Sequence, residues 1–215
     1  MVCATFEGVR VNIVLLGANG RTGREVLDRA LRAGDTVTAL VRAKGKLADI
    51  SHERLDVQVG SACDPRVLEA LLPGQDVVIS TLGPRRPTRA SAAIYSDSAS
   101  SIVDAMQGSD VNRLLATSSA LLFPSDRLLD RVLRGFASNI VKEARRMEER
   151  ICSSSLDWTI ARTGFLTNDT GTSYRQAEGA SPEGGGSISR AAVACFLLAE
   201  ARQSTHLRQV VGLCA

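Results

Sequence analysis

The segment that decides the fold reads VNIVLLGANGRTG over residues 11–23. Its first six residues form a short apolar run, which is typical of a buried parallel strand. Glycine then recurs at Gly17, Gly20 and Gly23, and residues 22–33 carry apolar side chains at helical spacing. We therefore predict a strand, a glycine-rich turn and a helix in direct succession.

Each of these glycines meets a separate physical need. Gly17 permits a tight turn out of the strand, Gly20 lets the backbone approach a pyrophosphate, and Gly23 allows the helix to pack closely on the strand. The free N–H groups at the start of the helix attract an anion. The pattern predicts a dinucleotide-binding loop, and a plain glycine turn without a ligand is the alternative.

The rest of the chain alternates short β-branched runs with longer helical segments. This order predicts an α/β fold of the Rossmann type, with a doubly wound parallel sheet, right-handed crossovers and helices on both faces. The expected strands after the first are 36–41, 54–59, 76–80, 113–117, 157–162 and 208–213, and the expected helices after the first are 65–72 (capped by Asp64), 90–106, 128–152 and 189–200.

The length of 215 residues suits a single NAD(P)-binding Rossmann domain over residues 1–215. Residues 167–186 are rich in Gly, Ser, Thr and Asn. We expect a small C-terminal excursion there, with 167–187 as a flexible segment on the substrate side. A short hairpin is expected at residues 173–177.

The composition excludes several classes of protein. Apolar residues make up 44% of the chain and charged residues 23%, with a formal net charge of +3. That charge is too small to indicate a nucleic-acid partner. No apolar run reaches the length of about 18 residues that a membrane span needs. The first ten residues lack the apolar core of a signal peptide, so we expect a cytoplasmic protein.

The spacing of the cysteines, histidines and charged residues does not match that of metal ligands. The five cysteines are odd in number and form no C-x-x-C pair, so we expect reduced and mostly buried thiols. His52 and His206 lie in polar segments and are expected at the surface. Residues 142–150 alternate in charge; Lys142 and Glu143 could help to place an acceptor, but a solvent-exposed face of a helix is the simpler interpretation.

The end of the second strand indicates which nicotinamide cofactor is bound. An NAD-binding protein usually places Asp or Glu there to bind the ribose 2′-hydroxyl. Here Arg42 ends the strand, Lys44 and Lys46 follow, and no carboxylate occurs before Asp49. A guanidinium can bind a 2′-phosphate bidentately, and Arg21 could reach the same group. The sequence therefore predicts NADPH, the alternative being a solvated surface turn.

Several segments resemble one known group of proteins, the NmrA-like atypical short-chain dehydrogenase/reductases. The similar segments are GANGRTG at 17–23, ALVR at 39–42, GQDVVISTLG at 74–83, LATSSA at 115–120, LDWTIARTG at 156–164 and ISRAAVA at 188–194. Together they span nearly the whole chain. Its length and layout look most like the biliverdin reductase B (flavin reductase) branch and the quinone reductases of aromatic polyketide pathways.

The resemblance implies a role for residues along one edge of the sheet. This sequence differs from the group near the expected adenine position, where it has Gly60-Ser61-Ala62 in place of the group's Gly-Asp-Val. The implied contacts are Gly17, Asn19, Gly20, Arg21, Thr22 and Gly23 for the pyrophosphate, Arg42 and Lys46 for the 2′-phosphate, Ser61 and Ala62 for the adenine, Leu82, Gly83, Arg85 and Thr117 for the groove, Ser118 and Ser119 beside the nicotinamide, and Thr163, Gly164, Phe165 and Leu166 at its carboxamide.

The sequence argues against one common chemistry of this superfamily. Many short-chain reductases use a Tyr proton donor with a Lys four residues later, but Tyr95 and Tyr174 are followed at that spacing by Ala99 and Glu178. Serine hydroxyls at a strand end can still orient an acceptor by hydrogen bonding. Ser118 and Ser119 are therefore the expected catalytic residues, the alternative being ordinary polar residues at the end of a sheet.

We therefore expect an NADPH-dependent reductase of a planar aromatic acceptor such as a quinone, a flavin or a tetrapyrrole-like pigment. In a polyketide pathway, a reduced quinone could support oxygenation, so that the protein would serve as a monooxygenase component in antibiotic biosynthesis. The alternative is a non-catalytic, NADP-sensing regulatory protein of the NmrA-like group. The expected partner is a small molecule, without nucleic acid or membrane, for a monomer or weak homo-oligomer.

Overall fold

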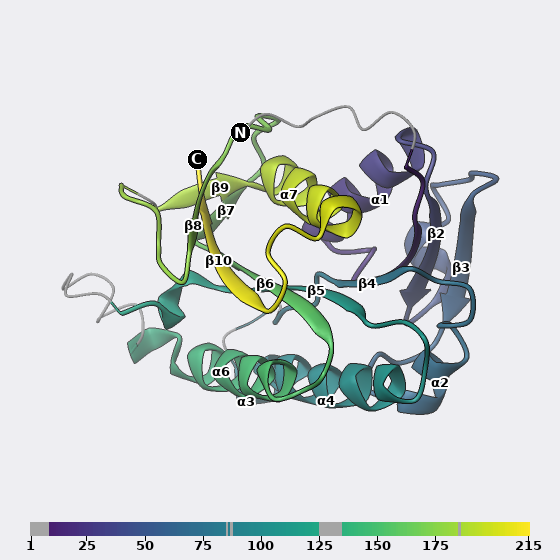
Figure 1. Ribbon diagram of the computed structural model, residues 1–215, viewed down its shortest axis with the longest axis horizontal. Coiled ribbons are helices and arrows are strands. Elements are labelled where there is room, and N and C mark those ends of the chain that lie inside the picture. The colour runs from purple at the N-terminus through teal and green to yellow at the C-terminus, as the bar shows by residue number, and fades with distance from the viewer. Residues whose placement is uncertain (1–8, 85, 87, 125–134, 185) are drawn as a thin grey trace.

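The computed structural model describes residues 9–84, 86, 88–124, 135–184 and 186–215. Within them, an eight-stranded sheet runs through the centre in the order β3-β2-β1-β4-β5-β6-β10-β8 (Figure 1). A separate two-stranded sheet joins β7 and β9. The strands are β1 Asn12–Leu16, β2 Thr36–Val41, β3 Leu55–Val59, β4 Val77–Ser80, β5 Arg113–Ser119, β6 Asp157–Thr163, β7 Phe165–Thr167, β8 Arg175–Glu178, β9 Ser187–Ser189 and β10 Gln209–Cys214.

The central sheet is parallel except at one edge. All neighbouring strands from β3 to β10 pair in parallel, and β8 alone in this sheet runs antiparallel, against β10. From β1 the chain moves outward to β2 and β3, then returns to β4 on the other side of β1 and continues to β5 and β6. This reversal confirms the doubly wound Rossmann fold.

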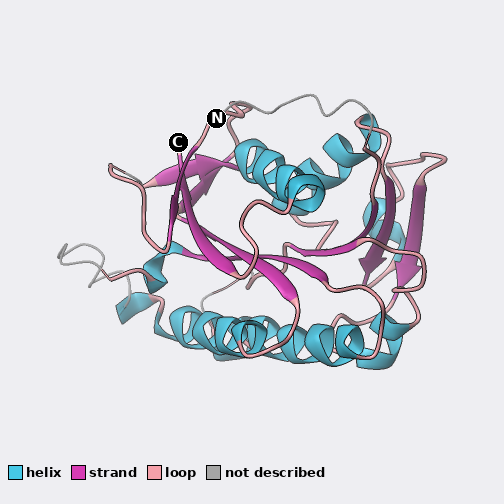
Figure 2. Cartoon of the chain, viewed as in Figure 1, coloured by secondary structure: helices cyan, strands magenta, loops and turns pink. Residues whose placement is uncertain are grey.

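Helices cover both faces of the sheet, which gives three layers (Figure 2). Successive residues of a strand point to opposite faces, so Ile13 and Leu15 join one core while Val14 and Leu16 join the other. Residues of α1 Arg21–Arg32 and α7 Arg190–Gln203 pack in the first core. The second core includes residues of α2 Pro65–Glu69, α4 Ile94–Gln107 and α6 Ser138–Cys152, while the short α3 Arg89–Ala92 lies next to α6.

Most element boundaries agree with the sequence-based expectations within one or two residues, and Asp64 caps α2 as expected. Strand β5 extends two residues further than predicted because its pairing with β6 continues through Ser119. The helix expected at 90–106 is divided into α3 and α4. The helix expected at 128–152 begins partly within 125–134, outside the described residues, and α6 starts at Ser138.

The hairpin predicted at residues 173–177 is wrong. Arg175 to Glu178 form β8, which pairs with Cys214 to Val211 of β10 rather than with a neighbouring segment. The polar composition suggested a local turn, but β10 offers a free sheet edge that an extended segment can join. Whether the rest of 167–187 is flexible stays a prediction.

Several expected surface residues are buried. His206 is 4% exposed, and Glu143 and Glu148 are 5% and 6% exposed on the inner side of α6, so the expectation of a purely solvated charged face is wrong. The cysteines also differ from the expectation: Cys63 and Cys152 are exposed, whereas Cys195 and Cys214 are buried. Cys3 lies outside the described residues.

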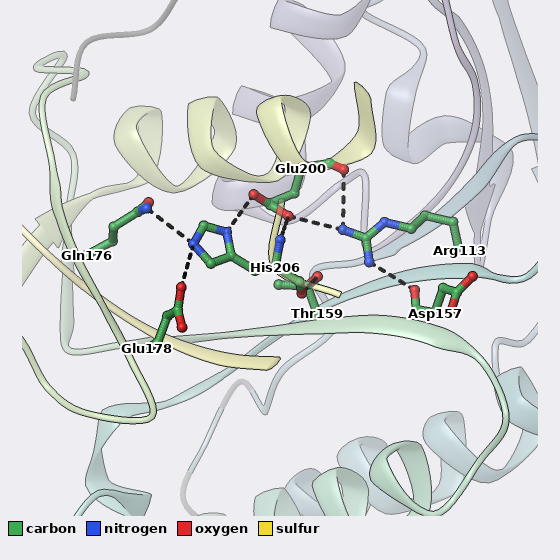
Figure 3. A network of polar contacts seen from close by, with 7 residues as sticks. All are labelled: Arg113, Asp157, Thr159, Gln176, Glu178, Glu200 and His206. Carbon is green, nitrogen blue, oxygen red and sulfur yellow. Dashed lines mark hydrogen bonds and ion pairs between the residues drawn. The ribbon is translucent and has the colours of Figure 1, made fainter. Parts of the chain in front are cut away.

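The buried His206 belongs to a polar network at the starts of β5 and β6 (Figure 3). Glu200, near the end of α7, accepts from Arg113 Nη2 at 3.1 Å through Oε2, and its Oε1 lies 2.7 Å from His206 Nδ1. Arg113 also donates to the carbonyl of Asp157 at 2.9 Å, and Thr159 donates to the carbonyl of His206 at 2.6 Å. The network therefore fastens the turn between α7 and β10 to the sheet.

Candidate dinucleotide and acceptor site

The candidate site lies where the strand order reverses, outside the carboxyl ends of β1 and β4. Open α/β sheets bind ligands in this crevice because the loops on its two sides diverge. The two strand ends are joined by Thr81, whose backbone N and Oγ1 both donate to the carbonyl of Leu16, at 2.9 and 3.1 Å. These two hydrogen bonds therefore hold the ends of β1 and β4 together at the base of the crevice.

The glycine loop adopts the close-packed form that its sequence predicts. Gly17 has φ +87°, a left-handed conformation that glycine adopts without strain, and Gly20 N donates to Gly17 O at 2.8 Å. A Cβ on Gly23 would lie 2.1 Å from Gly17 O. Any larger residue there would push the helix from the loop, so the backbone cradle depends on glycine.

The start of α1 is suited to an anion. Its N-cap residue is Gly20, no side chain caps the helix within the described chain, and the first turn contains no acidic residue. The N–H groups of that turn and the helix dipole therefore favour a bound negative charge. Arg21 adds an exposed cation. The residues present fit the diphosphate of a dinucleotide.

The turn that follows β2 carries exposed cations and is held to α1 by hydrogen bonds from Arg24. Arg42 and Lys46 are both exposed. Arg24 of α1 binds Asp49 through two contacts of 2.5 and 3.0 Å and also donates to the carbonyl of Lys46 at 2.9 Å. The ion pair lowers the pKa of Asp49 and raises that of Arg24, in each case chiefly through their hydrogen bond. Asp49 is thus occupied by Arg24 rather than available for a ribose hydroxyl.

Arg42 also lies near the segment that follows β3. Burial, followed by the charge of Asp97, raises the pKa of the Cys63 thiol, while Arg42 acts in the opposite direction. Ser61 beside it is exposed and accepts a hydrogen bond from Cys63 N at 3.2 Å. The cations and the expected adenine residues therefore share one end of the crevice.

A cavity of about 250 Å³ lies at the other end of the crevice. It is lined by the starts of α1, α4, α6 and α7, the loop after β4, the ends of β5 and β6, and one residue of β7. Its walls mix apolar side chains with hydroxyls, as small-molecule sites generally do. The lining residues are Thr22, Thr81, Leu82, Gly83, Pro84, Tyr95, Thr117, Ser118, Ser119, Ile140, Thr163, Gly164, Leu166 and Val193.

The hydroxyl of Ser118 is held from behind by a buried ion pair. Ser118 Oγ donates to Glu148 Oε1 at 2.5 Å. Arg162 of β6 donates to the same carboxylate through Nε at 3.0 Å and Nη2 at 2.6 Å. Its guanidinium lies 4.5 Å from the ring centre of Phe123. Because the Ser118 proton is directed to Glu148, Ser118 offers lone pairs rather than a proton to the cavity.

The hydroxyl of Ser119 accepts a hydrogen bond from the protein, whereas that of Ser118 donates one. Ser119 Oγ accepts from Leu121 N at 3.3 Å and caps the short 3-10 helix η2 Ala120–Leu122. A hydroxyl that accepts through oxygen keeps its proton for donation. The two adjacent serines therefore present different hydrogen-bonding capacities to the cavity.

A larger hollow, of about 510 Å³, lies at the opposite edge of the sheet. Its walls include Glu69, Asp76 and Asp110, and it adjoins the segments that precede β4 and β5. Ligands of open α/β sheets bind at the carboxyl ends of the strands, not at this edge. We therefore place the functional site at the smaller cavity.

The structure brings many of the expected site residues to the crevice. Phe165 does not line the cavity and is 66% exposed, because it alternates with Leu166 along β7. Arg85 lies outside the described residues. The expected residues that line the cavity are Thr22, Leu82, Gly83, Thr117, Ser118, Ser119, Thr163, Gly164 and Leu166, and those placed along the crevice beyond it are Gly17, Asn19, Gly20, Arg21, Gly23, Arg42, Lys46, Ser61 and Ala62.

Other cavity residues were not anticipated from the sequence. Tyr95 lacks a lysine at the spacing typical of a tyrosine proton donor, and Ile140 and Val193 lie on helices whose inward faces are typical of a core. Glu148 carries the contact behind Ser118 but belongs to a charged run that suggested solvent exposure. Of these residues, Arg162 and Val193 had a signal, because each lies in one of the segments that resemble the known group.

The fold and the crevice together define a Rossmann-type dinucleotide-binding protein. A family model described as NAD(P)H-binding matches residues 17–204, and the chain belongs to that family. This match confirms the family-level resemblance inferred from the sequence and the assignment of an NAD(P)H cofactor.

Solved structures show the same fold at low sequence identity. ChuY, an anaerobillin reductase from Escherichia coli O157:H7, is 23% identical, with a TM-score of 0.77 over 94% of this chain and 96% of that one. A candidate NADH-flavin reductase from Streptococcus pneumoniae is 21% identical, with a TM-score of 0.77 and coverage of 95% and 99%. A short-chain dehydrogenase/reductase from Veillonella parvula, crystallised with NADP, is 23% identical, with a TM-score of 0.73 and coverage of 96% and 95%.

The helices of the described residues were compared with the length and apolar character of membrane-spanning helices. None of them combines the length and the apolar character that a membrane crossing requires.

Proposed function

We propose that this protein is an NADPH-dependent reductase that transfers hydride to a planar aromatic acceptor: a quinone, a flavin or a tetrapyrrole-like pigment. The observation that carries the proposal is the cavity of about 250 Å³, which lies beside the start of α1 and is lined by apolar groups and hydroxyls. A dinucleotide whose diphosphate lies at Gly17 to Gly23 would extend its nicotinamide toward this cavity.

The preference for NADPH rests on the charges after β2. Arg42 and Lys46 are exposed cations, whereas the nearest following carboxylate, Asp49, is bound by Arg24. A 2′-phosphate would meet a guanidinium here, and a free ribose hydroxyl would find no available carboxylate in this turn.

The chemistry requires little from the protein beyond placement. Reduced nicotinamide supplies the hydride when it is bound. Leu82, Ile140 and Leu166 provide apolar walls that can hold a flat ring and exclude water. Ser119 can donate a hydrogen bond to the acceptor, and Ser118 can accept one.

The acceptor class is supported by two of the structural neighbours, which are named as reductases of a flavin and of anaerobillin. We extend this to quinones, including those of a polyketide pathway in which the reduced product supports oxygenation. The proposal also keeps the expected cytoplasmic location, a small-molecule partner and a monomeric or weakly associated state.

The test is an assay with three acceptors. The protein is mixed with NADPH and FMN, a naphthoquinone or biliverdin, and the absorbance of reduced nicotinamide is followed. Turnover with at least one acceptor supports the reductase. Tight NADPH binding without turnover of any planar acceptor overturns it and favours a sensor of the NADP state.

Cofactor preference is tested by Arg42→Glu. Loss of a charge-assisted contact to phosphate costs about 1.5–3 kcal/mol, so NADPH affinity should fall roughly 10- to 100-fold, with NADH affinity nearly unchanged. Calorimetry with both cofactors measures this. Arg145→Glu, at an exposed position of α6, is the matched control and should change neither affinity. Equal losses for both cofactors in Arg42→Glu would contradict the assignment to the 2′-phosphate.

A further inference from the structure

The side chain of Tyr95 enters the candidate site from the opposite side to the glycine loop. It projects from the first turn of α4, is 8% exposed, and lines the cavity together with Ser118 and Ser119. We propose that Tyr95 donates a hydrogen bond to the acceptor oxygen that becomes negatively charged when hydride arrives. This inference rests on the proposed reductase function and adds one group to its site.

The position of the hydroxyl supports this role. Tyr95 Oη lies 3.4 Å from the point where a Cβ on Gly83 would stand, and Gly83 lines the same cavity. Glycine at this position leaves the hydroxyl accessible to a ligand. Within the described part of the chain, no hydrogen bond is recorded for Tyr95 Oη, whereas a buried tyrosine hydroxyl usually has a partner.

The two serines leave room for a second donor. Ser118 directs its proton to Glu148 at 2.5 Å and can only accept from a ligand. Ser119 can donate, but one donor binds one oxygen well, and a quinone or flavin carries carbonyl groups on more than one side of its ring. Tyr95 comes from α4 and Ser119 from the end of β5, so the two hydroxyls reach the cavity from separate elements. The two residues could therefore hold separate oxygens of one flat acceptor.

The electrostatic surroundings keep Tyr95 protonated. Burial, followed by the nearby charge of Glu148, raises its pKa to about 12. A phenol in this state is a poor acid but a permanent donor throughout the neutral range. Tyr95 therefore differs from a tyrosine that a lysine activates for proton transfer, and its role agrees with the absence of a lysine at the usual spacing.

The reaction balances without a proton from Tyr95. With a quinone, hydride carries two electrons and one hydrogen to the acceptor, NADPH is oxidised to NADP⁺, and one acceptor oxygen gains negative charge. Tyr95 stabilises that oxygen through its O–H bond, which stays intact. A proton from water then completes the hydroquinone.

The first test compares Tyr95→Phe with Tyr174→Phe. The Tyr95 variant keeps the ring and removes only the hydroxyl, and loss of one donor to a developing oxyanion lowers kcat on the order of 10²-fold. Its affinity for NADPH should match the wild type, which also verifies folding. Tyr174 is 4% exposed and packs edge-on against Phe196 in the other core, so its variant should retain the wild-type kcat.

The second test measures binding without turnover. The anion of 2-hydroxy-1,4-naphthoquinone spreads its negative charge over its oxygens and absorbs visible light, so it imitates the charged acceptor. Titrated into protein that is saturated with NADP⁺, it should bind roughly 10-fold more weakly to Tyr95→Phe than to the wild type or to Tyr174→Phe. The shift of its visible band on binding should shrink in the same variant.

The outcomes separate this inference from the proposed function. If the wild type reduces no planar acceptor, the reductase proposal fails. If the wild type is active and Tyr95→Phe keeps both its kcat and its affinity for the naphthoquinone anion, Tyr95 is a packing residue and the inference fails. A loss of NADPH affinity with unchanged kcat would also overturn it, because Tyr95 would then contact the cofactor.

Discussion

Strands β5 and β6 carry a buried arginine–glutamate network at each end, and the two networks differ in what they face. At the starts of the strands, Arg113 and Glu200 are enclosed with His206 (Figure 3). Near their ends, Arg162 and Glu148 hold Ser118, which lines the cavity. The first network runs from Arg113 through Glu200 and His206 to the exposed Glu178, away from the site, and is closed to the cavity in that sense; the second ends at the site and is open to it.

The hydrogen-bond partners of the two carboxylates, Glu200 and Glu148, show how the networks differ. Glu200 Oε2 accepts from Arg113 at 3.1 Å and from His206 N at 3.0 Å, and Oε1 meets His206 Nδ1. Within the described residues, this carboxylate contacts Arg113 of β5 and His206 of the α7–β10 turn, so its contacts are all to groups of the protein. Glu148 instead orients a hydroxyl that a ligand can reach. The closed network thus contributes to stability, while we expect the open one to contribute to stability and turnover together.

The largest expected effect is that of Glu200→Gln on stability. The substitution leaves the guanidinium of Arg113, whose side chain is 9% exposed, without the carboxylate that it contacts. Removing one partner of a buried pair destabilises by about 3–5 kcal/mol. Urea denaturation followed by circular dichroism should show this loss in the free energy of unfolding.

The same variant tests whether the closed end is separate from the site. In the fraction that remains folded, NADPH affinity and kcat should equal those of the wild type, because Glu200 is not among the residues that line the cavity. A fall in kcat at full NADPH saturation would show that the two ends are coupled and would break the comparison.

An intermediate effect is expected for Glu148→Gln at the open end. Arg162 is 16% exposed, lies over Phe123 and can turn toward water, so the loss should be about 1–2 kcal/mol. Unlike Glu200→Gln, this variant should lower kcat several-fold, because Ser118 loses the charged acceptor that fixes its proton. Denaturation and steady-state kinetics measure the two effects. A stable variant with unchanged kcat would show that Glu148 only braces the strands.

The elements that the sequence predicted well are those with local signals. The glycine loop at Gly17 to Gly23, the apolar runs of the strands and the Asp64 cap depend on residues close together in the chain. The family model and the structural neighbours confirm the Rossmann fold that these signals predicted. The residues at the ends of β4, β5 and β6 could be placed near one another for the same reason, since parallel strands end at one edge.

The two networks could not be predicted because they depend on distant contacts. Ser118 and Glu148 are 30 residues apart, and Arg113 and Glu200 are 87 apart. In a single sequence, Glu148 looks like one more charge on a helix, and His206 looks like a surface residue. Tyr95 has no lysine four residues later, so no local signal marks it, and its position depends on how α4 packs against the sheet.

The smallest effect concerns the charge that Glu148 places near Cys152, at the end of α6. Cys152 is exposed as a residue, but its thiol is partly buried; this partial burial, followed by the charge of Glu148, raises the pKa of Cys152 to about 11, and Arg162 acts in the opposite direction. Alkylation requires the thiolate, so at pH 8 iodoacetamide should react slowly with Cys152, and its rate should rise with pH toward that value. In Glu148→Gln the pKa should fall, and a fall of one unit increases the thiolate about tenfold.

Peptide-resolved mass spectrometry can compare the labelling rates of Cys152 and Cys63 in one sample. Only Cys152 should react faster in Glu148→Gln, because the pKa of Cys63 depends on its own burial and on Asp97, without a contribution from Glu148. Under native conditions Glu200→Gln should leave both rates unchanged, since Glu200 belongs to the closed end. Faster labelling of both cysteines in either variant would indicate general loosening, and the charge at the open end would then not be the cause.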